Sequence, residues 1–178
     1  LSIYAHELAQ NASKYYNVIE LVNTKFTWSV RSKANDRLYV QMKKNIFDSL
    51  YLDQLNIKIH LHNKHLVNYV SNNVIGHIPA KKKAKGTIML TAHYDHLGRM
   101  GIDTYFPGAN DNASGIAMLL QLGEKLKSRP LKRYNILLVA FSGEEAGLLG
   151  SKYMSENPIC DLATVRFLLN LDIMGSGE

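Results

Sequence analysis

The chain has 178 residues, of which 46% are apolar and 20% charged, and its formal net charge is +6. This composition is typical of a globular domain with a sizeable core, and no apolar run reaches the roughly 18 residues that a membrane span requires. A single cysteine, Cys160, excludes a disulfide framework within these residues. The net charge does not indicate a nucleic-acid partner, because Lys81, Lys82, Lys83 and Lys85 crowd into one turn without interleaved aromatic residues.

Two helices are predicted in the first 50 residues. Residues 1–24 carry apolar side chains at helical spacing. A second helix is predicted to begin near Asn35 or Asp36, because either side chain can cap free backbone N–H groups. Its apolar stripe would consist of Leu38, Met42, Ile46 and Leu50.

The apolar period then changes from that of a helix to that of a strand. Residues 55–61 alternate between apolar and polar side chains, which predicts a half-buried strand. Residues 66–78 are its expected hairpin partner. We expect His60, His62 and His65 to face solvent rather than a metal, because two of them fall on the polar face of the strand.

The later elements alternate between unbroken apolar strands and helices. Strands are expected at residues 87–93, 135–141 and 165–171, helices at 113–126 and 146–155, and a loop at 99–110. The inward face of the first of these helices should carry Ile116, Leu119, Leu120, Gly123 and Leu126.

This order of elements predicts an α/β fold. Strands that are apolar throughout are buried on both faces, so helices must cover both faces of the sheet. With the hairpin at one edge, the expected architecture is a three-layer α/β/α sandwich with a mixed, mostly parallel central sheet. We expect residues 1–178 to form a single domain, with helices in residues 1–50 and the sheet and site residues in 51–178.

Acidic and imidazole side chains stand where the inner elements begin or end, and they indicate a metal site. They are His93, Asp95, Asp111, Glu144, Glu145 and Asp172. In open α/β sheets, ligands bind outside the carboxyl ends of the strands. Crowded carboxylates repel one another without a cation, and zinc takes imidazole and carboxylate ligands. Any one of these residues alone would be an ordinary cap or loop acid, but four separate elements delivering them favour a metal.

Four segments resemble those of the co-catalytic di-zinc aminopeptidases, family 28 of the metallopeptidases. They are TAHYDHLG (91–98), GANDNASG (108–115), FSGEEAGLLGS (141–151) and LNLDIMG (169–175). The match runs in the family's order from about residue 73 to the end, whereas the first 70 residues are only loosely similar. The resemblance implies a zinc-dependent aminopeptidase that removes residues from peptides with a free N-terminus, with two zinc ions per complete site.

The resemblance also implies the metal ligands. Asp111 would bridge the two zinc ions. His93 and Asp172 would complete the ligands of one ion, and Glu145 would bind the other.

The remaining roles follow from the same resemblance. Glu144 would be the general base for a metal-bridged hydroxide that attacks the peptide carbonyl. Asp95 would hold the His93 ring in its tautomer. A cis peptide bond is implied between Asp111 and Asn112. His96 matches no motif role and is expected to be a loop residue beside the site.

The chain departs from the family pattern at its end. The family uses a fifth ligand, a histidine well beyond the LNLDIMG segment, whereas this chain ends at Glu178. We therefore expect a fold truncated on its C-terminal side, inactive or weakly metallated by itself, from an active parent aminopeptidase. The chain begins at Leu1 without a charged, apolar leader, and we expect an exported protein, periplasmic or extracellular, whose signal has been removed. A boundary inside a longer chain would give the same beginning.

Two other functions stay open. A glutaminyl cyclase shares the fold and a glutamate pair but uses one zinc, and the Asn-Ala-Ser-Gly run after Asp111 and Gly-Leu-Leu-Gly after Glu145 favour the peptidase. A non-catalytic binding module of the same fold is disfavoured by the four intact motifs. Release of N-terminal residues, pyroglutamate formation and metal content would separate the three. The sequence indicates neither the preferred N-terminal residue nor the oligomeric state.

Overall fold

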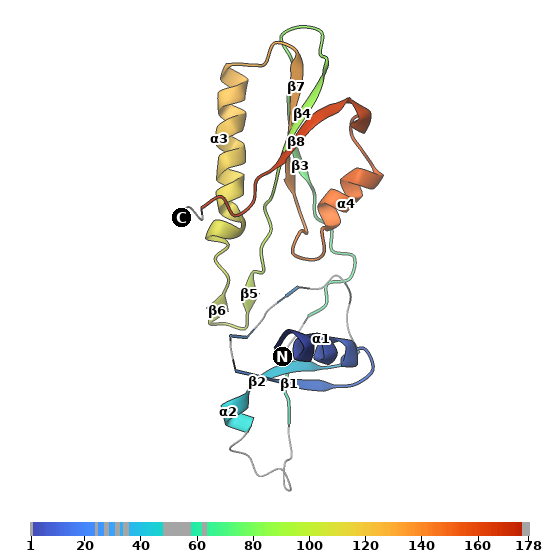
Figure 1. Cartoon of the computed structure of the whole chain (residues 1–178), viewed down its shortest axis with the longest axis vertical. Coiled ribbons are helices and arrows are strands. Elements are labelled where there is room, and N and C mark those ends of the chain that lie inside the picture. Colours follow the sequence, from blue (N-terminus) through green and yellow to red (C-terminus); the bar gives the residue numbers. More distant parts are fainter. Residues whose placement is uncertain are drawn as a thin grey trace. The chain divides into compact units, whose positions relative to one another are not determined.

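The computed structural model describes residues 2–23, 25–26, 29–30, 33, 36–47, 58–61 and 64–175. The chain divides into two compact units, Leu1–Trp28 with Lys33–Val67, and Ser29–Ser32 with Asn68–Glu178 (Figure 1). Among the described residues, no helix is both long and apolar enough to cross a membrane. The single-domain prediction stays a prediction, and each unit is described by itself.

The first unit contains strands where helices were predicted. It consists of α1 (Ser2–Ala12), β1 (Val18–Val22), β2 (Tyr39–Lys43) and the single-turn α2 (Lys44–Phe47), and β1 pairs with β2 in parallel. The helix predicted over residues 1–24 therefore ends at Ala12, because the β-branched run that follows favours a strand.

The second predicted helix is wrong over residues 39–43, which form β2, whereas Lys44–Phe47 is helical as predicted. Tyr39 pairs with Val18, and the Tyr39 hydroxyl donates a hydrogen bond to Glu20 of the neighbouring strand. Pairing with β1 thus decides the conformation of a segment whose four-residue apolar spacing resembled a helix. Two residues of that prediction, Asn35 and Leu50, lie outside the described residues.

The predicted hairpin is not formed as expected. Residues 55–57 and His62 lie outside the described residues, and residues 58–61 have no regular secondary structure. Within 66–78 only β3 (Val74–Ile78) is a strand, and it pairs antiparallel with β7 (Tyr134–Phe141). His60 and His65 are exposed, as predicted.

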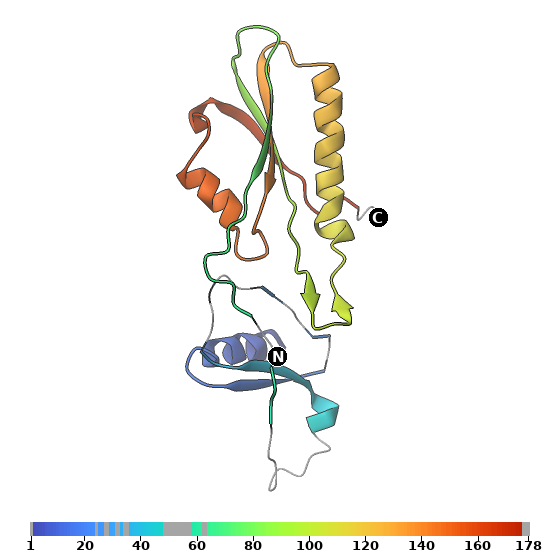
Figure 2. The ribbon, with the colours of Figure 1, turned by 180° about the vertical axis from the view of Figure 1, so that it is seen from behind.

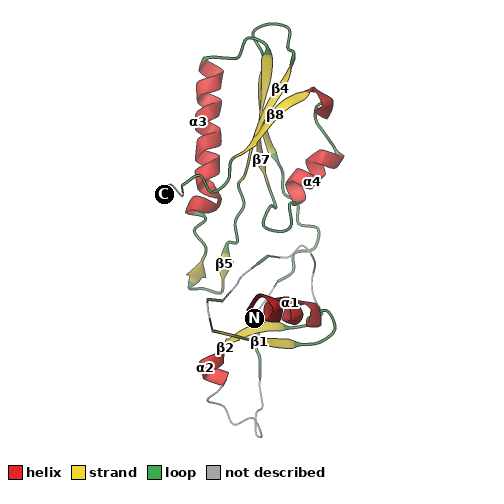
Figure 3. Ribbon diagram, viewed as in Figure 1, coloured by secondary structure: helices red, strands yellow, loops and turns green. Residues whose placement is uncertain are grey.

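The second unit is built on a four-stranded sheet in the order β3-β7-β4-β8, with β4 at Gly86–His93 and β8 at Val165–Asn170. Figure 3 labels three of these strands, β4, β7 and β8. β4 runs parallel to both β7 and β8, while β3 is antiparallel at one edge, so the predicted mixed, mostly parallel sheet is confirmed. In register, His93 lies opposite Phe141 and Thr91 opposite Asn170. The carboxyl ends of the three parallel strands consequently finish together.

Helices on both faces of this sheet complete the predicted α/β/α sandwich. α3 (Gly115–Ser128) and α4 (Leu149–Glu156) lie on opposite sides of the strands in both views (Figures 1 and 2). Successive side chains along each strand point to opposite faces of the sheet, so two separate hydrophobic cores form. One core contains Ile78, Leu90, Ala92, Leu119, Ile136 and Leu171, and the other contains Met89, Leu137, Val139 and Met154.

Two burial predictions are wrong. Leu119 and Gly123 are buried on the inward face of α3 as predicted, but Leu120, also placed there, is 68% exposed. β8 was predicted to be buried, yet Phe167 and Leu168 are each 55% exposed, because β8 is the edge strand of the described sheet.

The predicted loop over residues 99–110 contains a short hairpin of β5 (Arg99–Met100) and β6 (Thr104–Tyr105). A wide helical turn, η2 (Ala109–Ser114), follows and leads directly into α3. Between α4 and β8 lies a 3₁₀ turn, η3 (Leu162–Thr164). The turn η2 matters most, because it carries Asp111 and Asn112 to the end of the sheet.

Candidate metal centre

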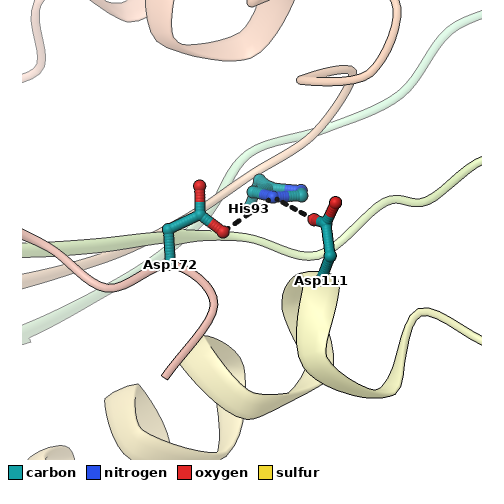
Figure 4. A group of neighbouring side chains, drawn as sticks. All are labelled: His93, Asp111 and Asp172. Carbon is teal, nitrogen blue, oxygen red and sulfur yellow. Dashed lines mark ion pairs between the residues drawn. The ribbon is translucent and has the colours of Figure 1, made fainter. Parts of the chain in front are cut away.

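His93, the last residue of β4, is buried, with a side chain 4% exposed. Its Nε2 atom lies 3.1 Å from Oδ1 of Asp111 on η2 and 3.5 Å from Oδ1 of Asp172, which follows β8. Figure 4 shows both carboxylates directed at the ring from opposite sides. Donor atoms of these three residues all lie within 4.8 Å of one another, a spacing that could hold a metal ion.

Asp95 contacts His93 through both its backbone carbonyl oxygen and its carboxylate. The Nδ1 atom of His93 lies 3.1 Å from the backbone carbonyl oxygen of Asp95 and 3.8 Å from its carboxylate. The carbonyl is thus the closer acceptor for an Nδ1 proton, which would leave Nε2 free to face the other carboxylates. The Asp95 carboxylate instead accepts hydrogen bonds from the backbone N–H groups of Glu144 and Glu145, at 3.0 and 3.1 Å.

The two glutamates follow β7 in a turn that begins at Gly143, whose φ of 70° favours glycine. The turn is closed by hydrogen bonds from the N–H groups of Gly147 and Leu148 to the carbonyl oxygen of Glu144. Burial raises the pKa of the Glu144 carboxyl above its ordinary value, and neighbouring carboxylates raise it further against a lowering by His93. Although the two glutamates are adjacent in sequence, Glu144 lines a cavity and Glu145 contacts His96.

Glu145 belongs to a second cluster, with His96 and Asp111. Donor atoms of these three residues also lie within 4.8 Å of one another, and Nδ1 of His96 is 2.7 Å from Oε1 of Glu145. His96 had been assigned no part in the site. In the sequence, the one indication was that His96 lies three residues after His93. That spacing places His96 in the site only once the conformation of the loop is known.

Asn112 is a further site residue that sequence reasoning missed. It is 2% exposed, and its side-chain amide donates to the carbonyl oxygens of His93 and Leu171, at 3.3 and 3.0 Å. Its Oδ1 atom accepts from the N–H groups of Gly115 and Ile173, at 3.0 and 3.3 Å. The peptide bond between Asp111 and Asn112 is cis, as the resemblance implied. Asn112 therefore ties together the segments that carry His93, Asp111 and Asp172.

The residues after Asp172 are held by η2 in the same manner. The N–H group of Met174 donates to the Ser114 hydroxyl at 2.9 Å, and that of Gly175 donates to the Asn110 side chain at 2.7 Å. Asp172 follows the last residue of β8 that pairs with β4, Asn170, and these bonds together with those of Asn112 hold the backbone on both sides of it.

A cavity of about 370 Å³ opens beside the first cluster. His93, Glu144 and Asp172 are among its polar lining residues, and its apolar lining includes Met89, Leu148, Met154, Leu162 and Leu168. Of the two glutamates, Glu144 lines this cavity while Glu145 is directed at His96.

The charges of the site fit a cation. Its acids are Asp95, Asp111, Glu144, Glu145 and Asp172, and its ion pairs are with imidazoles. Across the described parts of the chain, no lysine or arginine pairs with these carboxylates. The buried atoms Nδ1 of His96 and Oε1 of Glu145 contact each other at 2.7 Å and have no further partner among the described residues. A metal such as zinc would compensate carboxylates that no lysine or arginine pairs with.

Comparisons with known proteins agree with this chemistry. Residues 73–178 match the model of peptidase family M28. The chain is similar to aminopeptidase YwaD of Bacillus subtilis, with 36% identity over 115 residues, which is 64% of this chain and 24% of that protein. It is likewise 36% identical over 108 residues to a probable zinc metalloprotease of Leptosphaeria maculans, covering 59% of this chain and 25% of the relative.

A solved structure of an Acidobacteriales bacterium glutaminyl cyclase is also similar, with 30% identity and a TM-score of 0.46, over 58% of this chain and 38% of that one. The chain spans about a quarter of the length of the two curated relatives named above.

Proposed function

Because the chain belongs to peptidase family M28, we propose that it carries the metal centre of a zinc-dependent aminopeptidase. The observation that carries the proposal is the convergence of His93, Asp111 and Asp172, which three separate elements bring within ion-pair distance. One imidazole and two carboxylates with an open side toward a cavity are the donor set of a catalytic zinc site. The names of the relatives, an aminopeptidase and a zinc metalloprotease, support the same activity.

Two zinc positions are proposed. His93, Asp111 and Asp172 would hold one ion, and Asp111 with Glu145 would hold the other, so that Asp111 bridges them. Its presence in both clusters supports the bridge. When bound, zinc would polarise the scissile carbonyl and lower the pKa of the attacking water.

Glu144 is proposed as the general base. Its carboxyl lines the cavity beside His93 and Asp172, where it would accept a proton from the attacking water and return it to the leaving amine. Burial raises the pKa of Glu144, which is the direction that favours a group that must both take and release a proton.

Asp95 is proposed as a positioning residue. Its carbonyl oxygen would orient the His93 ring, and its carboxylate fixes the backbone from which Glu144 and Glu145 project.

The carboxylates of Asp111 and Asp172 are partly exposed, 45% and 38%, and would attract the free α-ammonium group of a peptide substrate.

Zinc analysis together with a product assay tests the proposal. The amount of zinc bound per chain is measured on these 178 residues. Turnover is measured on the natural protein in which they occur. We expect chelator-sensitive release of single N-terminal residues from peptides, detected by mass spectrometry, and its loss in Glu144→Gln. Pyroglutamate formation instead would identify a glutaminyl cyclase, and zinc binding without either reaction would indicate a binding module.

A further inference from the structure

Positive charge gathers at the end of the second unit's sheet that lies opposite the metal centre. The turn between β3 and β4 carries four exposed lysines, Lys81, Lys82, Lys83 and Lys85. The backbone N–H groups of Lys81, Lys82 and Lys85 donate hydrogen bonds to the carbonyl oxygens of residues 131–133, at 3.0, 3.0 and 2.8 Å. The turn is therefore fixed against the segment that leads from α3 into β7, and both connections lie at one end of the strands in Figures 1 and 2.

Other elements bring further cations to the same place. The last turns of α3 and the segment before β7 add five exposed side chains, those of Lys125, Lys127, Arg129, Lys132 and Arg133. Arg166, exposed near the start of β8, lies over Gly86, where an added Cβ atom would be 2.5 Å from the arginine Cγ. Ten of the chain's 21 lysines and arginines thus form what we call the basic end, the cations of residues 81–85 and 125–133 together with Arg166.

Little negative charge offsets the basic end. Within the described residues none of its ten side chains forms an ion pair, and the carboxylates closest to it along the chain are Glu124 and Asp161. The acids of the metal centre lie past the other end of β4, whose eight residues span about 25 Å at about 3.3 Å each. That span is about three Debye lengths at physiological ionic strength, so those acids do not neutralise the basic end.

We propose that the basic end is a docking surface for a membrane that contains anionic lipids, with the metal centre on the side that faces away from the bilayer. Seven of the ten cations are lysines, whose flexible stems and compact charges fit mobile lipid headgroups better than a fixed array of phosphates. A surface for single-stranded nucleic acid would add aromatic side chains for stacking, and residues 79–86, 124–133 and 161–166 contain none. The inference does not depend on the proposed zinc function.

Flotation with lipid vesicles tests this surface on the natural protein in which these residues occur. We expect binding to vesicles of equal parts phosphatidylglycerol and phosphatidylcholine, no binding to phosphatidylcholine alone, and release as the NaCl concentration rises. Each lysine close to an anionic bilayer contributes about fivefold in affinity. The combined variant Lys81→Gln, Lys82→Gln, Lys83→Gln and Lys85→Gln should therefore bind at least about 100-fold more weakly.

A second fourfold variant controls for the loss of net charge. It removes four exposed lysines outside the basic end, as Lys25→Gln, Lys58→Gln, Lys64→Gln and Lys152→Gln, and should weaken binding by less than about fivefold. Both variants should keep the parental circular dichroism and zinc content. On the anionic vesicles, amide hydrogen exchange of the parent should slow in residues 81–85 and stay unchanged in residues 93–98.

The outcomes distinguish a membrane from other anionic partners. Absence of binding to the anionic vesicles, or equal weakening by the two fourfold variants, would overturn the proposal. Tighter binding to duplex or single-stranded DNA than to the vesicles at the same salt concentration would also overturn it and would identify a nucleic-acid surface. None of these results bears on the zinc function, which the metal content tests separately.

Discussion

Removing the Asn112 side chain should loosen the whole site, because this one amide connects its three segments. Asn112→Ala deletes hydrogen bonds to the carbonyl oxygens of His93 and Leu171 and from the N–H groups of Gly115 and Ile173. Two of these bonds, to the carbonyl oxygens of His93 and Leu171, are buried and measure 3.3 and 3.0 Å, and a buried group left unpaired costs about 1–3 kcal/mol. The two together give a destabilisation of about 2–6 kcal/mol, a large part of the roughly 5–15 kcal/mol that stabilises a typical domain.

The assay for this prediction is urea denaturation combined with amide hydrogen exchange. The free energy of unfolding should fall by the stated amount. Exchange should accelerate at the amide of Ile173, which loses its acceptor, and at that of Gly115, which keeps only the backbone carbonyl oxygen of Asn112. Asn157→Ala is the matched control, because Asn157 is exposed and makes a single side-chain bond of 3.2 Å to Tyr153. Its removal should cost less than about 1 kcal/mol.

Asn112→Asp distinguishes lost hydrogen bonds from lost volume. Aspartate keeps the acceptor for Gly115 and Ile173, but it cannot donate to His93 and Leu171 and it buries a charge beside Asp111. We expect it to be at least as destabilising as the alanine variant. Stability within about 1 kcal/mol of the parent for both variants, with unchanged exchange at the two amides, would refute the idea that Asn112 holds the site together.

Three further predictions follow from the site and the core. Glu144→Gln should keep the zinc content and lower turnover about 10²–10⁴-fold, the usual contribution of general base catalysis. Glu145→Gln should instead lower the zinc content, and an equal loss of metal in both variants would contradict the assigned roles. Asp95→Ala removes the acceptor for two backbone N–H groups and should destabilise the chain by about 1–3 kcal/mol in urea denaturation, with partial rescue by Asp95→Asn. Leu119→Ala should cost about 2–5 kcal/mol because the side chain is 4% exposed, whereas Leu120→Ala, at 68%, should stay within about 0.5 kcal/mol; similar values for both would contradict the observed orientation of α3.

The central sheet could be predicted because buried parallel strands have an unmistakable composition. β4 and β7 read as unbroken apolar runs, and the residues after them fall at one edge once the strands align. Those two facts suffice to bring His93, Glu144 and Glu145 near one another, without any knowledge of the loops.

The first unit could not be predicted in the same way, because short apolar patterns are ambiguous. Leu38, Met42 and Ile46 recur at a helical spacing, yet Tyr39 and its neighbours form β2 by pairing with β1. The deciding partner lies about twenty residues away along the chain, so no local period reveals it.

Contacts that depend on loop conformation could not be predicted for a related reason. The two-residue spacing of His93 and Asp95 suggested a side-chain contact, whereas the backbone carbonyl lies closer to the ring and the carboxylate bonds to the next strand's turn. Asn112 follows Asp111 directly, and its neighbouring residues do not indicate that its amide bridges β4 and the end of β8.

The four residues from His93 to His96 explain how one strand end can serve an entire site. His93 is directed at Asp111 and Asp172, Asp95 binds the backbone of both glutamates, and His96 is directed at Glu145. Tyr94, between them, donates a hydrogen bond to the carbonyl oxygen of Asn72 at 2.8 Å. Because the side chains leave this segment in different directions, a change in its backbone would shift the proposed ligands of both metal positions at once. Substitutions that disturb the segment should therefore affect both ions, whereas removal of the His93 imidazole should affect only one.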